Sequence, residues 1–316
     1  MDVLRLTLRQ LQIFVAVAHS GSTTAASVAI ALSQSATSSA IGELERLLSL
    51  QLFDRAGKRL LLNDNGRALL PRALAMLDGA AGIEQMAHDG SDQAQSLRIG
   101  ASTTIGNYVL PQQLGRFLAW RQSDQAAAWQ SRVMIGNTAA IARAVADFEL
   151  DVGLIEGACH EATLQVTPWL QDTLVIVASP AHALAQVAKV SVSALREAVW
   201  LLRETGSGTR ETTDQALLPH LRSYRRSIEL GSSEAIKHAA VQGLGIACLS
   251  RWVVEDLIAD GRLRCLATPL PVIQRECHLI MQRDKQMTPA LLAFIACVTA
   301  DAGGGSATAS SGSTRP

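Results

Sequence analysis

The chain has 316 residues, of which 48% are hydrophobic, 4% aromatic and 18% charged, and its formal net charge is zero. That length is enough for two or three domains with separate cores. No apolar run approaches the length of a membrane span and no leader pattern opens the chain, so we expect a cytoplasmic protein without a membrane partner. Zero net charge neither favours nor excludes a nucleic-acid partner, because phosphate binding depends on local clusters of Lys and Arg.

The sequence carries no motif of catalysis or metal binding. The five cysteines are odd in number and widely spaced, without a CxxC pair, so we expect reduced core residues. The seven histidines are scattered, and no GxSxG, HExxH, P-loop or complete GxGxxG pattern occurs. We therefore expect no catalytic residues, no metal and no cofactor, and we do not expect an enzyme.

Three short helices are expected at the start of the chain. Residues 8–19 carry apolar side chains at helical spacing. The stretch SGSTT breaks this pattern and offers Ser22 or Thr23 as the N-cap of a second helix that runs to Ala31. Ser33 then caps a third helix.

The third helix, SQSATSSAIGELERLL (33–48), has two contrasting faces at 100° per residue. One face contains Thr37, Ala40, Ile41, Leu44, Leu47 and Leu48, and the other contains Ser35, Ser38, Ser39, Gly42 and Arg46. A face of small side chains lets the helix backbone approach another surface closely. This property suits insertion into the major groove of DNA.

The next segment, residues 50–66, predicts a small β-hairpin, or wing, beside the helices. Phe53 is expected to pack inward, Gly57 to form the turn, and Leu60 to Leu62 to return as the second strand. The basic residues of the wing would lie along phosphates or enter the minor groove, and they are Arg55, Lys58 and Arg59.

A helix of roughly twenty residues is expected from about Gly66 to Met86, with Asn63 or Asp64 as its cap. Its apolar stripe cannot be buried by the helix alone, which implies a partner helix and therefore a homodimer. Residues 88–96 are the linker that follows.

From residue 97 short apolar strands and helices alternate, which is typical of βαβ units and predicts a parallel sheet in two α/β lobes. The expected strands are 96–102, 131–137, 151–157, 173–179, 199–204, 245–250 and 277–283, and the expected helices are 106–120, 138–150, 208–218 and 234–243. The predicted domains are a DNA-binding domain (1–65), a linker helix for dimerisation (66–90), an effector-binding domain (91–301) and a disordered polar tail (302–316).

Polar residues cluster where three of the expected strands end, which is where open α/β folds bind ligands. The candidates for effector binding are Ser102, Thr103, Thr104, Asn137, Thr138, Arg203, Ser207 and Thr209, with Arg210 as an alternative source of positive charge. Simple N-capping explains one hydroxyl of the run at 102–104 but not three, whereas a helix start rich in hydroxyls suits an anion. Glu156 argues against an anion if it lines the cleft, and it would then favour an amino acid or pair with an arginine.

The first ninety residues resemble the LysR-type transcriptional regulators. The matching segments, in the order and spacing of that family, are LRQLQIFVAVAHSGSTTAAS, LSQSATSSAIGELERLL, LQLFDR and NDNGRALLPRALAML. Later segments resemble the effector domain of the group that includes the YeiE-type and CysL-type regulators of sulfur and anion metabolism, namely ASTTIGNYVLP, MIGNT, DVGLIEG, WLLRETGSGTR and ELGSSEAIKHAAVQGLGIACLS. The resemblance covers about residues 7 to 300.

The resemblance implies an N-terminal winged helix-turn-helix, α-helical with a small β wing, and a two-lobed α/β effector domain like that of periplasmic binding proteins. It implies a ligand-responsive regulator whose partners are double-stranded promoter DNA, a small-molecule effector and further copies of the chain in a homodimer or homotetramer. A sulfite- or sulfate-like anion is the expected effector. The alternative is a solute-binding protein or an enzyme that uses the same two-lobed fold.

The resemblance also places the DNA contacts. By position the candidates are Thr23, Ser33, Gln34, Ser35, Ser38 and Ser39. A glutamine suits adenine N6 and N7, and serines suit phosphates or base edges. Two residues depart from the family: Thr37 stands where a bulky aliphatic residue is usual, which predicts slightly weaker packing, and Asn63 stands where Thr is usual and caps equally well.

Overall fold

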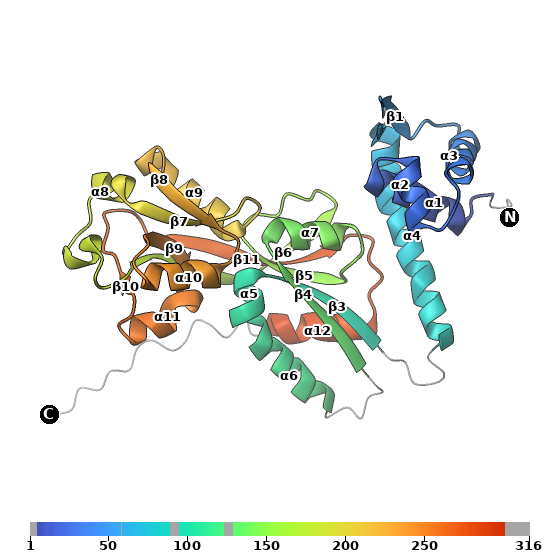
Figure 1. Ribbon diagram of the computed structural model, residues 1–316. Coiled ribbons are helices and arrows are strands. Elements are labelled where there is room, and N and C mark those ends of the chain that lie inside the picture. Colours follow the sequence, from blue (N-terminus) through green and yellow to red (C-terminus); the bar gives the residue numbers. More distant parts are fainter. Residues whose placement is uncertain (1–4, 58, 89–94, 123–128, 301–316) are drawn as a thin grey trace. The chain divides into compact units, whose positions relative to one another are not determined.

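The computed structural model describes residues 5–57, 59–88, 95–122 and 129–300 (Figure 1). They form two compact units, described separately below: residues 1–93 with 284–286, and residues 94–283 with 287–316. Three predicted features lie wholly or mostly outside the described residues: the wing residue Lys58, the linker 88–96 and the polar tail 302–316.

The first unit contains three short helices, a hairpin and a long fourth helix. Its elements are α1 (Leu8–Ser20), α2 (Thr23–Ala29), α3 (Gln34–Leu48), β1 (Phe53–Ala56), β2 (Arg59–Leu62) and α4 (Asp64–His88). The first three helices begin after Thr7, Ser22 and Ser33, whose hydroxyls each accept a hydrogen bond from a backbone N–H in the first turn. Helix α2 ends before the predicted Ala31, because Ala31 adopts a left-handed φ of 53° that a helix cannot continue.

The hairpin of β1 and β2 is the predicted wing, and it shares a core with the helices. Its strands pair antiparallel, and Gly57 takes a φ of 63° in the turn. The Leu60 amide donates to the Gly21 carbonyl at 2.9 Å, which joins the wing to the turn after α1. Phe53 is buried against Phe14, with ring centroids 5.6 Å apart.

Helix α4 is only partly buried by the unit to which it belongs. The predicted cap Asn63 accepts a hydrogen bond from the Gly66 amide at 3.0 Å. Ala73 is buried in the core of the unit, whereas Met76 and Ile83 are 51% and 69% exposed. The helix therefore presents apolar surface that its own unit does not cover.

The second unit is built on a mixed sheet, which has nine strands in the described part of the chain. They are β3 (Gln95–Ser102), β4 (Trp129–Gly136), β5 (Val152–Glu156), β6 (Leu164–Ala178), β7 (Val199–Arg203), β8 (Arg226–Leu230), β9 (Ile246–Ser250), β10 (Arg264–Cys265) and β11 (Ile273–Gln282). Their order is β4-β3-β5-β11-β6-β9-β7-β8, and β10 pairs with β6. Strand β3 is parallel to β4 and β5, and β7 is parallel to β8 and β9.

The prediction of a parallel sheet is wrong at β6 and β11, which pair antiparallel with each other and with their other neighbours. With 15 and 10 residues, these strands are long enough to run through both lobes. The sequence pattern showed only the apolar second half of β6, because the first half is mostly exposed or half-buried and contains Pro168. The two lobes are therefore joined by a continuous antiparallel pair.

Helices cover both faces of the sheet in each lobe (Figure 1). They are α5 (Thr103–Tyr108), α6 (Leu110–Gln122), α7 (Thr138–Ala146), α8 (Val192–Glu197), α9 (Gly208–Leu221), α10 (Ser233–Val241), α11 (Arg251–Ala259) and α12 (Pro289–Ala300), with a short 3₁₀ turn at Ala183–Gln186. In the first lobe α5, α6 and α12 pack around Phe117 and α7 packs around Ile141. In the second lobe α8 and α9 pack around Trp200, and α10 and α11 pack around Ile236. Each lobe thus has two cores of its own.

The single helix predicted over 106–120 is two helices, α5 and α6. Pro111 lies in the first turn of α6, where its missing N–H needs no partner. In the middle of a longer helix the same proline would remove a backbone hydrogen bond and clash with the preceding turn.

None of the helices in the described ranges is long and apolar enough to cross a membrane.

Candidate functional site

Helix α3 presents the polar face that its sequence predicts. The candidate DNA contacts on it are all exposed, and they are Ser33, Gln34, Ser35, Ser38 and Ser39. Ile41 and Leu44 on the opposite side are buried. The Ser33 hydroxyl already accepts from the Ala36 amide at 3.1 Å as the helix cap, so its remaining hydrogen-bonding capacity is smaller than that of the other serines.

Thr37, the residue that departs from the family pattern, is fully buried beneath this face. Its hydroxyl donates to the Ser33 carbonyl at 3.0 Å. A buried hydroxyl that is hydrogen-bonded avoids the cost of an unsatisfied polar group. The short side chain therefore fits the core without leaving its polar atom unpaired.

A polar hollow of about 350 Å³ lies between α3 and the wing. Its lining includes Thr23, Gln34, Ser38, Gly42, Arg55 and Arg59. Both arginines are exposed, and neither forms an ion pair with another residue in the described ranges. Exposed guanidinium groups without a carboxylate partner are suited to phosphate oxygens.

Replacing Arg55 by alanine is expected to weaken binding to duplex DNA of any sequence and to reduce the dependence of affinity on salt. The reason is that one phosphate contact per subunit is lost, which lowers the slope of log K against log salt by about 1 for each subunit that binds the DNA. Fluorescence anisotropy at several salt concentrations measures both effects, and the exposed Arg262 of the second unit, replaced by alanine, is the matched control. A loss confined to one DNA sequence would contradict the phosphate role.

In the second unit the three predicted strand ends meet where the two lobes face each other. The Thr138 hydroxyl donates to the Glu156 carbonyl at 3.0 Å and accepts from the Gly208 amide at 3.1 Å. The Ala139 amide also donates to the Gly206 carbonyl at 3.0 Å. The lobes therefore touch through backbone groups at the starts of α7 and α9.

Most of the predicted effector residues are already hydrogen-bonded within the protein. Ser102 donates to the Glu156 carboxyl, and Thr103 donates to the Gly136 carbonyl. Asn137 and Ser207 cap α7 and α9. Ser102 itself, by contrast, makes no capping bond to α5.

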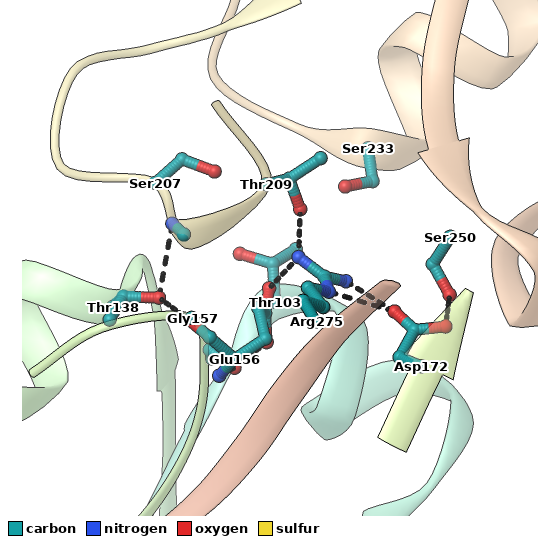
Figure 2. A network of polar contacts seen from close by, with 12 residues as sticks. Thr103, Thr138, Glu156, Gly157, Asp172, Ser207, Thr209, Ser233, Ser250 and Arg275 are labelled. Carbon is teal, nitrogen blue, oxygen red and sulfur yellow. Dashed lines mark hydrogen bonds and ion pairs between the residues drawn. The ribbon is translucent and has the colours of Figure 1, made fainter. Parts of the chain in front are cut away.

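Arg275, which the sequence analysis missed, lies at the centre of this region. Its Nε donates to Asp172 Oδ2 at 2.8 Å and its Nη1 donates to Thr209 Oγ1 at 2.8 Å. Nη1 also lies 4.0 Å from Glu156 Oε1, and Ser250 donates to the other oxygen of Asp172 at 2.8 Å (Figure 2). Because Arg275 and Asp172 face each other across β11 and β6, this ion pair joins the two strands that connect the lobes.

The two arginines considered for the cleft differ in position. Arg203 is 2% exposed, and its guanidinium contacts Ser233 at 2.8 Å and Thr103 of the other lobe at 3.4 Å. Arg210 is instead paired with Asp214 at 2.7 Å and Glu229 at 3.2 Å. Arg203 therefore faces the opposite lobe, whereas Arg210 is paired with carboxylates of its own lobe.

The Glu156 carboxyl is fully enclosed by this network. Burial raises the pKa of Glu156, and the opposing effects of Arg275, Arg203 and the Thr104 hydroxyl do not cancel that increase. The hydroxyl of Thr104 is buried beside Glu156 without a hydrogen bond of normal geometry to any described residue. The cleft thus combines a buried carboxyl whose pKa is raised with a buried hydroxyl that has no hydrogen bond of normal geometry among the described residues.

Comparisons with known sequences agree with this arrangement. Residues 8–67 match the lysR family of bacterial regulatory helix-turn-helix proteins, and residues 90–303 match the LysR substrate binding domain. The chain belongs to the LysR-type transcriptional regulators. The HTH-type transcriptional regulator YeiE of Escherichia coli K12 is 47% identical over 292 residues, which are 92% of this chain and 97% of YeiE.

A second sequence relative supports the same assignment, and a solved structure shows the same fold. CysL of Bacillus subtilis is 34% identical over 254 residues, which are 78% of this chain and 82% of CysL. The crystal structure of ArgP from Mycobacterium tuberculosis has the same fold, with a TM-score of 0.67 at 18% identity over 95% of this chain and 98% of ArgP. These families are transcriptional regulators rather than enzymes, so this LysR-type chain is a DNA-binding regulator with an effector-binding domain.

Proposed function

We propose that the protein regulates transcription in the cytoplasm in response to a small anion, first of all sulfite or sulfate, that binds between the two lobes. The observation that carries this proposal is the buried, unsatisfied hydroxyl of Thr104. An unpaired buried donor is costly to the fold. An oxyanion that accepted its proton would remove that cost.

The charges around the cleft favour a compact anion held largely by neutral donors. Arg203 and Arg275 are both buried, but their guanidinium groups are already paired with Glu204 and Asp172. Hydrogen bonds from hydroxyl groups would therefore supply much of the binding. Because its pKa is raised, Glu156 repels an anion less than an ordinary carboxylate in the same place would.

An anion that contacts both lobes would stabilise one angle between them, as any ligand shifts a protein toward the conformation that it binds better. Strands β6 and β11 are the elements that would accommodate the change, because they run through both lobes. The partners in this proposal are promoter DNA at α3 and the wing, the anion, and a second copy of the chain. Pairing of two copies would use the apolar surface that α4 leaves exposed at Met76 and Ile83.

Replacing Thr104 by valine is expected to weaken sulfite binding by about 1–3 kcal/mol, because valine keeps the shape of the side chain but removes the donor. Isothermal titration calorimetry of the full chain measures this change, and the exposed Thr163 replaced by valine is the control. Unchanged affinity in a folded Thr104→Val protein would remove Thr104 from the site. Absence of both sulfite and sulfate binding in the wild type would refute the anion proposal itself.

A further inference from the structure

A side-chain hydrogen bond connects the two helices of the helix-turn-helix. Gln34 Nε2 donates to Thr23 Oγ1 at 3.1 Å, although the two residues are 11 positions apart. Thr23 is the first residue of α2 and Gln34 is the first residue of α3. Both side chains line the polar hollow between α3 and the wing.

In this structure the Nε2 side of the Gln34 amide faces Thr23, which leaves the carbonyl oxygen Oε1 on the outward side. The amide has one carbonyl oxygen and two N–H donors. One N–H is committed to Thr23, so Oε1 and the second N–H remain available, and no other residue in the described ranges bonds to them. An acceptor and a donor side by side match the N6–H and N7 positions of adenine in the major groove.

The opposite orientation of the amide would select a different base. If the carbonyl oxygen turned toward the Thr23 hydroxyl, both N–H groups would face outward. Two donors match the two acceptors of guanine, O6 and N7. An amide without a fixed orientation would satisfy either base and discriminate poorly between them.

We propose that Thr23 is a positioning residue that determines sequence specificity, because its hydroxyl holds the Gln34 amide in the orientation that reads adenine. The inference rests on the proposed placement of α3 in the major groove. Gln34 is exposed and free to meet a base, whereas Thr23 is half-buried at the start of α2. Thr23 therefore acts through Gln34 and needs no contact with the base itself.

The test uses the full-length protein and duplexes selected from a randomised library at a fixed salt concentration. The wild type is expected to prefer adenine at one position of each half-site by roughly 5- to 150-fold, as a bidentate contact provides. Gln34→Ala should abolish that preference. Thr23→Val, which removes the hydroxyl but keeps the shape, should reduce it by about 2- to 10-fold at the same base pair.

Two controls separate positioning from a general effect on binding. Thr23→Ser keeps the hydroxyl and should retain the preference for adenine. The double variant Thr23→Val with Gln34→Ala should match Gln34→Ala alone, because the hydroxyl acts only through the amide. If circular dichroism shows that Thr23→Val is unfolded, Thr23→Ala takes its place with the same expected result.

The possible failures are distinguishable. Equal weakening on every duplex in Thr23→Val would make Thr23 a phosphate contact and overturn the positioning role. A preference lost in Gln34→Ala but intact in Thr23→Val would overturn the positioning role alone. If Gln34→Ala left the base preference unchanged at every position of the half-site, the placement of Gln34 on a base would be wrong. The positioning role of Thr23 would then be wrong as well.

Discussion

Replacing Arg275 by methionine is expected to lower the free energy of unfolding of the effector domain by about 3–5 kcal/mol, the range for breaking a buried ion pair from one side. The Asp172 carboxylate would stay buried, with Ser250 as its one remaining donor among the described residues. Urea unfolding followed by tryptophan fluorescence measures this change. All five tryptophans lie between residues 120 and 252, so the signal reports on this domain.

The matched control replaces both members of the pair, with Arg275→Met and Asp172→Leu in one chain. Removing two buried charges together is often close to neutral, because the penalty for an uncompensated charge disappears. The double variant should therefore recover part of the stability lost in Arg275→Met, with the remainder reflecting the loss of Arg275 beside the buried Glu156. Equal destabilisation of the single and double variants would show that packing around the Arg275 side chain, rather than its charge, stabilises this part of the sheet.

The DNA-binding unit could be predicted closely from the sequence because its signals are local. Ser22 and Ser33 cap α2 and α3 as their side chains indicate. The apolar stripe that ends at Leu44 and Leu48 identifies the buried face of α3 without any knowledge of the rest of the fold. Ala31 is the exception, since its left-handed conformation follows from the tertiary path of the turn and not from its helix propensity.

The sheet of the effector domain was predicted less completely because part of its order depends on contacts between distant segments. Strands β3, β5 and β7 are short apolar runs, of which β3 and β7 are followed by helices, and the sequence shows them. Strands β6 and β11 mix polar and apolar residues, since each is buried in some places and exposed in others. Their antiparallel pairing joins residues about 100 positions apart, and no local pattern reports such a pairing.

The same difference between local and long-range signals explains why the residues of the cleft could be predicted only in part. Hydroxyl-rich strand ends such as Ser102 to Thr104 are visible in the sequence as clusters. Arg275 is not, because it is a single basic residue in the polar-looking segment IQREC and acquires its role only when β11 places it opposite Asp172. Clusters of polar residues at strand ends can therefore be recognised in the sequence, whereas a single buried arginine such as Arg275 cannot.

Replacing Gly208 by alanine is expected to force the two lobes apart at the start of α9. A Cβ atom at this position would lie 1.9 Å from the Glu156 carbonyl oxygen and 2.8 Å from the Thr138 hydroxyl. The first neighbour is backbone and cannot rotate away, so α9 or β5 must move, and the hydrogen bond from the Gly208 amide to Thr138 would break. The free energy of unfolding should fall by about 1–3 kcal/mol or more, as overpacking of a tight contact does.

Gly231→Ala is the matched control, because Gly231 lies in the same lobe with no atom close enough to meet an added Cβ. Tryptophan fluorescence in urea should show a clear loss of stability for Gly208→Ala and little change for Gly231→Ala. Sulfite should also raise the melting temperature of Gly208→Ala less than that of the wild type, because a ligand that needs both lobes in contact binds more weakly when a methyl group separates them. If Gly208→Ala and Gly231→Ala had the same free energy of unfolding, the lobes would separate at the start of α9 without a loss of stability.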